Sequence, residues 1–107
     1  MKLEQFLKEI KEADYIYSYL DKNFNGSCPC FRGKKKIEGA WVYFNAHCWR
    51  TTINSYVGGC DCPYSGIHLK SKLPRKDLLK IGRAVKKILN DMKWSEWTLK
   101  IDKVEDK

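Results

Sequence analysis

Acidic residues are scarce in the middle of this sequence, and long apolar runs are missing from it. Between residues 22 and 95 the only acids are Glu38, Asp61, Asp77 and Asp91. A mechanism that needs two carboxylates therefore has few candidates. No run of 18 apolar residues occurs, which argues against a membrane-spanning helix. The first fifteen residues contain no apolar stretch of signal-peptide length, so we expect a cytoplasmic location.

The familiar catalytic motifs are also missing. The sequence has no glycine-rich phosphate loop, no serine elbow and none of the paired His, Glu and Cys signatures of zinc hydrolases and deaminases. His47 and Cys48 are sequence neighbours and would point to opposite faces of a strand, which argues against a Cys–His nucleophile pair. We therefore expect a protein that is not an enzyme.

Positive charge, by contrast, is abundant and concentrated. The formal net charge is +8 over 107 residues. Residues 1–27 carry four lysines and five acids, whereas residues 28–107 carry seventeen Lys and Arg residues and eight acids. Such a cationic surface favours nucleic acid, anionic lipid or an acidic protein as a partner. The alternative is that the charge serves solubility alone.

Hydrophobic spacing predicts a single α+β domain. Periodicity indicates a helix over residues 2–22, then strands over 37–44, 50–57 and 67–70. A second, basic helix covers residues 73–94, a last strand covers 97–101, and a frayed polar tail begins at about residue 102. The order is helix, three strands, helix and strand. The expected fold is an antiparallel sheet with two helices on one face, formed by residues 1–107 together.

The strand over residues 37–44 has large apolar side chains in both of its alternating sets. Trp41 and Tyr43 belong to one set, and Val42 and Phe44 belong to the other. A strand that is apolar on both faces is usually central, with other elements packed on each side. We expect the same of this one.

The basic helix carries the clearest functional signal. Its apolar residues fill one stripe, and Lys76, Lys80, Arg83 and Lys87 fill another on the opposite side. Arg75 and Lys76 lie at the helix start, where free backbone N–H groups favour an anion. Further cations at Lys70, Lys72 and in a basic loop that contains Lys34, Lys35 and Lys36 extend the predicted binding surface.

These features predict a small basic protein that contacts the phosphates of nucleic acid, or a nucleoprotein complex, through its cationic helix face. Exposed aromatic residues such as Trp49 or Tyr64 are candidates for stacking on bases. The alternative is a non-enzymatic inhibitor or adaptor that docks its basic face on an acidic protein partner, such as a nucleic-acid-processing complex. No membrane partner is expected.

The five cysteines form two Cys-x-Cys pairs and one single residue. Cys28, Cys30, Cys60 and Cys62 could together supply four thiolates to one tetrahedral Zn²⁺, which would be a structural site because no position remains for water. In a cytosolic chain, paired cysteines favour metal over disulfides. Free, partly buried thiols and disulfides between the pairs are the alternatives. Cys48 is expected to be a core or strand-end thiol.

Overall fold

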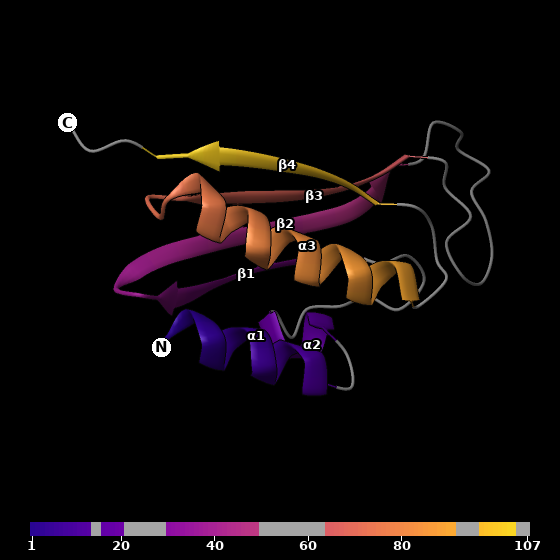
Figure 1. The fold of residues 1–107 in the computed structure, drawn as a ribbon. Helices are drawn as coiled ribbons and strands as arrows, with labels where there is room; N and C mark the ends of the chain where they lie inside the picture. Colours follow the sequence, from indigo (N-terminus) through magenta and orange to yellow (C-terminus); the bar gives the residue numbers. More distant parts are fainter. Residues whose placement is uncertain (14–15, 21–29, 50–63, 92–96, 105–107) are drawn as a thin grey trace.

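The structure is a computed structural model that describes residues 1–13, 16–20, 30–49, 64–91 and 97–104. Three helices and four strands are formed within these ranges (Figure 1). In chain order they are α1 (Leu3–Glu12), α2 (Ile16–Leu20), β1 (Cys30–Ile37), β2 (Ala40–Trp49), β3 (Tyr64–Ser71), α3 (Arg75–Asp91) and β4 (Thr98–Lys103). The predicted α+β order of helix, three strands, helix and strand is confirmed.

The four strands form one mixed sheet in the order β1-β2-β3-β4. Strands β1, β2 and β3 pair in antiparallel fashion, but β4 pairs with β3 in parallel. The prediction of a wholly antiparallel sheet is therefore wrong for the last strand. Its direction follows from the helix before it, because the 17 residues of α3 span about 25 Å. That length returns the chain to the start of β3, whose eight residues span about 26 Å.

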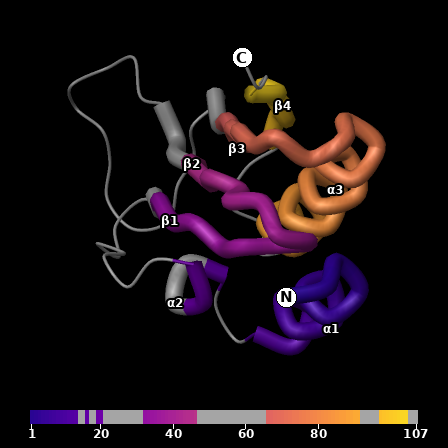
Figure 2. Tube along the Cα trace, turned by 90° about the vertical axis from the view of Figure 1, so that its left-hand side faces the viewer, coloured from indigo at the N-terminus to yellow at the C-terminus, as the bar shows by residue number. Residues whose placement is uncertain are grey.

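The helices α1 and α3 lie on the same side of the sheet, as predicted (Figure 2). Phe6 of α1 stacks on Phe44 of β2 with ring centroids 5.7 Å apart. The core between the helices and the sheet excludes water almost completely, and this burial is the main stabilising contribution. Its largest members are Trp97, Phe6, Phe44, Ile10, Ile16, Ile37, Ile67, Leu69, Leu78 and Ile81. Within the described residues, no helix is long and apolar enough to cross a membrane.

The helix predicted over residues 2–22 is divided in two. Ala13 has extended backbone angles (φ −73°, ψ 135°), and its N–H donates to the carbonyl of Ile10, which ends α1. The short helix α2 follows from Ile16. The break lets both pieces bury apolar residues, with Ile10 on α1 and Ile16 on α2 both fully buried.

The first strands are shifted from their predicted positions. The basic stretch 32–36, predicted as a loop, lies in β1. Ile37 ends β1, and Ala40 begins β2, so the predicted strand over 37–44 spans a hairpin turn. Residues 45–49, predicted as a connection, belong to β2. A strand whose one face is cationic lacks the apolar alternation on which the prediction depended.

The remaining strands agree in part. The predicted strand over 50–57 lies outside the described residues, whereas the one over 67–70 lies within the longer β3. The last strand continues to Lys103, so the tail predicted from residue 102 begins too early. The Val104 N–H still donates to the carbonyl of Ser71, 2.7 Å away.

Glu38 and Gly39 form the two-residue turn between β1 and β2. Both have positive φ (51° and 81°), as in the type I′ turns that suit hairpins. Glu38 adopts this unfavourable backbone conformation, and its side chain contacts the start of α1. One carboxylate oxygen accepts the N–H of Leu3 at 2.8 Å, and the other lies 3.7 Å from Nζ of Lys2. The acid thus caps a helix start that has no side-chain cap of its own.

Two glycines mark places where another element approaches too closely for a side chain. A methyl group on Gly33 of β1 would overlap the carbonyl oxygen of Leu20 and lie 2.7 Å from its carbonyl carbon. A methyl group on Gly82 of α3 would overlap the side chain of Leu99 on β4. The first contact holds α2 on the edge strand, and the second holds α3 on the parallel strand.

We expect Gly33→Ala to destabilise the protein by about 1–3 kcal/mol, because the added methyl group meets backbone that cannot rotate away. The free energy of unfolding in urea measures the effect. Gly66→Ala is the matched control, since a methyl group there meets only Oγ1 of Thr98 at 3.9 Å. Equal stability of the two variants would contradict the close approach of α2 to β1.

Candidate nucleic-acid interface

One face of the sheet packs on the helices, and the other carries charged and aromatic side chains. Side chains alternate along a strand, so the residues between the buried ones point away from the core. The outward-pointing residues named below are all exposed or half-exposed. We call this set the exposed sheet face: Arg32, Lys34 and Lys36 on β1, Trp41, Tyr43 and Asn45 on β2, His68 and Lys70 on β3, and Thr98, Lys100 and Asp102 on β4.

Pairing of the strands arranges this face in rows. Tyr43 stands opposite Lys34 on one side and Lys70 on the other. Trp41 stands opposite Lys36. Five of the eleven residues are cations and one is an acid, so this face presents a positive potential to solvent.

Trp41 and Tyr43 expose large aromatic rings among these cations. Trp41 keeps 45% of its surface exposed and Tyr43 keeps 47%. Nζ of Lys34 lies 4.7 Å from the Trp41 ring centroid, and Nζ of Lys36 lies 5.9 Å away, both within cation–π range. The expectation that other elements pack on both sides of β2 is therefore wrong for Trp41 and Tyr43. The strand is central in the sheet, but its second face is exposed.

Asp102, the acid of the exposed sheet face, forms a hydrogen bond with His68. Nε2 of His68 and Oδ2 of Asp102 lie 2.7 Å apart. This hydrogen bond lowers the pKa of Asp102 below its ordinary value, and the charges of Lys100 and Lys70 act in the same direction. Asp102 is therefore ionised at neutral pH and engaged with His68.

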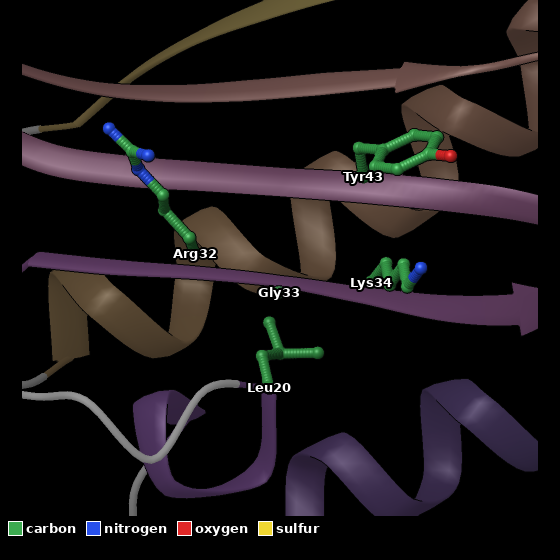
Figure 3. Close-up of a pocket in the computed structure, with 5 residues that line it drawn as sticks. All are labelled: Leu20, Arg32, Gly33, Lys34 and Tyr43. Carbon is green, nitrogen blue, oxygen red and sulfur yellow. The ribbon is translucent and has the colours of Figure 1, made fainter.

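A hollow of about 430 Å³ lies at the edge of the exposed sheet face. It is lined by Arg32, Gly33 and Lys34 of β1, by Tyr43 of β2 and by Leu20 of α2 (Figure 3). It is shallow and open to solvent, so it offers a place for part of a ligand and does not enclose one. The charged groups in its lining are both cations, which suits an anionic group.

Helix α3 supplies the second cationic surface. Arg75, Lys76, Lys80, Arg83 and Lys87, which we call the α3 stripe, are all exposed, while Leu78, Ile81, Val85 and Leu89 are buried. The predicted division of this helix into an apolar and a cationic face is confirmed. One member has an acidic neighbour, since Nζ of Lys87 lies 3.5 Å from Oδ2 of Asp91.

The two surfaces lie on opposite sides of the domain, because α3 covers one face of the sheet and its stripe points further outward. Of the predicted binding residues, Lys34, Lys36 and Lys70 meet on the exposed sheet face. Lys35 points to the helix side, where its Nζ lies 4.2 Å from the Tyr19 ring centroid. Lys72 is exposed but follows the end of β3.

The sequence analysis did not assign three members of the exposed sheet face to a binding surface: Trp41, Tyr43 and Lys100. Arg32 belongs to the basic stretch 32–36 that it did consider. Trp41 and Tyr43 were expected to be buried because of their size. The sequence does show that Lys34 and Lys36 are two residues apart, and so are Trp41 and Tyr43, so that each pair lies on one face of its strand. Only the register of the hairpin, however, places these residues on one face.

The predicted zinc ligands fall almost wholly outside this description. Cys28, Cys60 and Cys62 lie outside the described residues, and of Cys30 only the backbone is described, opposite His47 in the sheet. The side chains of Trp49 and Tyr64, predicted to be candidates for stacking, are likewise not described. The four-cysteine zinc site therefore stays a prediction.

No protein-family model, curated protein or solved structure matches this chain. A function must therefore be inferred from the chemistry of the two cationic surfaces.

The lowered pKa of Asp102 has a testable consequence for pH dependence. Folding lowers the pKa of Asp102 below its ordinary value of 3.8, so its hydrogen bond stabilises the folded protein fully at pH values above 3.8. That contribution is lost as the pH falls through the lowered pKa. In an NMR titration we expect His68→Ala to raise the pKa of Asp102 toward its ordinary value. An unchanged pKa in that variant would show that the hydrogen bond is not formed in solution.

The zinc prediction has a separate test. Protein purified without chelator is expected to contain close to one zinc per chain by elemental analysis, and replacing both Cys60 and Cys62 by Ser should abolish it. Zinc far below stoichiometry would favour free thiols.

Proposed function

We propose that this protein binds nucleic acid, and that the exposed sheet face is the main surface that contacts the phosphates. The observation that supports it is the position of two exposed aromatic rings on β2, with Lys34, Lys36 and Lys70 opposite them on the neighbouring strands and two further cations on the same face. Phosphate contacts by Lys and Arg supply most of the affinity of sequence-independent binding. The α3 stripe, from which the sequence first suggested nucleic-acid binding, is a second and independent candidate surface.

A face that served solubility alone would not expose Trp41 and Tyr43. Large aromatic rings cost free energy when water covers them, and soluble surfaces usually carry few of them. Here nearly half of the surface of each residue is exposed, although the same sheet buries Phe44 on its other side. The combination of rings and cations therefore favours a partner that is both aromatic and anionic.

The same composition disfavours an acidic protein as the partner. The centres of protein–protein interfaces are enriched in aromatic residues and Arg but depleted in Lys. On the exposed sheet face, four of the five cations are lysines, and three of them, Lys34, Lys36 and Lys70, stand directly opposite Trp41 or Tyr43 on the neighbouring strands. Lysine is a usual ligand of phosphate, to which it presents a compact charge.

The spacing of the cations suits an extended polyanion. Residues two apart on one strand lie about 6.8 Å apart, and neighbouring strands lie about 4.8 Å apart. Lys34 and Lys36 follow the first spacing, and Lys34, Tyr43 and Lys70 form one row across the strands. Cations thus recur at short intervals in both directions, with no need for a particular base sequence.

Two charge-reversal variants test the proposal and distinguish the two surfaces. Lys34→Glu with Lys70→Glu alters the exposed sheet face, and Lys80→Glu with Arg83→Glu alters the α3 stripe by the same total charge. We expect the first pair to weaken binding of a labelled oligonucleotide on the order of 50-fold at about 50 mM salt, through the loss of two phosphate contacts. The second pair should have a much smaller effect. Fluorescence anisotropy measures both.

Salt dependence provides the control for the mechanism. The slope of log K against log salt concentration should fall in magnitude by about 1.4 in the sheet variant, since each contact with a single strand contributes about 0.7. Loss of binding in the helix variant alone would move the site to the α3 stripe. No binding by the unaltered protein at about 50 mM salt would refute the proposal and leave an acidic protein as the remaining partner.

A further inference from the structure

We infer that the exposed sheet face selects single-stranded nucleic acid, with unpaired bases stacked on Trp41 and Tyr43. The inference rests on the proposed function and adds the class of ligand and the residues that select it. Its basis is the position of the two rings, which lie side by side on β2 with lysines on the flanking strands.

A duplex cannot use these rings. In a duplex the faces of the bases are covered by their neighbours, and only the edges and the backbone reach a protein. Trp41 and Tyr43 also stand about 6.8 Å apart along β2, which is twice the rise of about 3.4 Å per base along each strand of a duplex. A single strand can extend to this spacing and present one base to each ring.

The two lysines over Trp41, Lys34 and Lys36, must move aside when a base stacks on the ring. Lys34 lies 4.7 Å from the ring centroid in the free protein, and such an exposed cation–π contact is worth a factor of about two to five in an equilibrium constant. Stacking of a base on an aromatic ring is worth a factor of about five to 150. For two such lysines the loss is a factor of about four to 25, so stacking outweighs it over most of its range. Both lysines can then reach a phosphate beside the ring.

The hollow at the edge of β1 gives the strand room next to Tyr43. Arg32 and Lys34 line it on either side of Gly33, and the Tyr43 ring borders it on β2 (Figure 3). A nucleotide stacked on Tyr43 can place its phosphate there, between two cations. Gly33 itself faces the helix side, where it contacts Leu20, so the space next to Tyr43 is bounded by the side chains of Arg32 and Lys34.

DNA and RNA share the groups that this surface engages, namely phosphates and base faces. Lysines bind phosphate oxygens, and aromatic rings stack on any base. We therefore expect oligo-dT and oligo-U of equal length to bind with affinities within a few-fold of each other. A strong preference for one sugar would show that the 2′ position is engaged and would overturn this part of the inference.

Leucine variants test the stacking directly. Leucine keeps apolar surface but has no ring, whereas phenylalanine keeps the ring. We expect Trp41→Leu and Tyr43→Leu each to weaken binding of oligo-dT about tenfold, and Trp41→Phe and Tyr43→Phe to lose less than threefold. The variants should all fold normally, because both side chains are exposed, and thermal unfolding checks this.

A duplex of matched length separates this inference from the proposed function. The unaltered protein should bind it more weakly than oligo-dT, and Trp41→Leu should leave duplex binding unchanged. Binding of oligo-dT should also quench part of the tryptophan fluorescence, and Trp41→Leu should remove that part. Equal binding of both ligands, with no effect of the leucine variants on either, would overturn the inference while the proposed function stood. Absence of binding to both ligands at low salt would refute the two together.

Discussion

The strict alternation of side chains along β1 and β2 is the constraint on which this structure depends. Because one face of the sheet is buried under α1 and α3, each strand must present its apolar set to that side. Val42 and Phe44 satisfy this requirement on β2. The remaining set then has to point outward, including Trp41 and Tyr43, whatever its composition. The exposed sheet face is thus a consequence of the way in which the core forms.

Three close contacts hold the layers that produce this arrangement. Gly33 allows α2 to pack against the edge strand, and Gly82 allows α3 to pack on Leu99 of β4. The turn at Glu38 adds a third connection, because its carboxylate caps α1. Each contact joins segments that are far apart in the chain. Together they fix the sheet against the helices through contacts that do not involve the exposed sheet face.

The sequence was sufficient for the features that depend on local periodicity. The two faces of α3 follow from the spacing of Leu78, Ile81 and Val85, and the order of helices and strands follows from similar patterns. Strand β1 could not be predicted in this way, because its outward set is cationic and its inward set contains Gly33 and Lys35. The direction of β4 depends on the length of α3 relative to β3. The exposed sheet face depends on the hairpin register, which no single segment encodes.

The hydrogen-bonded ladder beneath the exposed sheet face has a consequence for the thermodynamics of recognition. Residues on paired strands have fixed backbone positions, so little main-chain order remains to be gained when a ligand arrives. The protein would lose rotamer freedom mainly in its exposed arginine and lysine side chains. Most of the conformational entropy lost on binding would therefore be lost by a flexible polymer ligand, which would adopt the conformation that the protein surface requires. Affinity should accordingly rise with any treatment that stiffens such a polymer in an extended form.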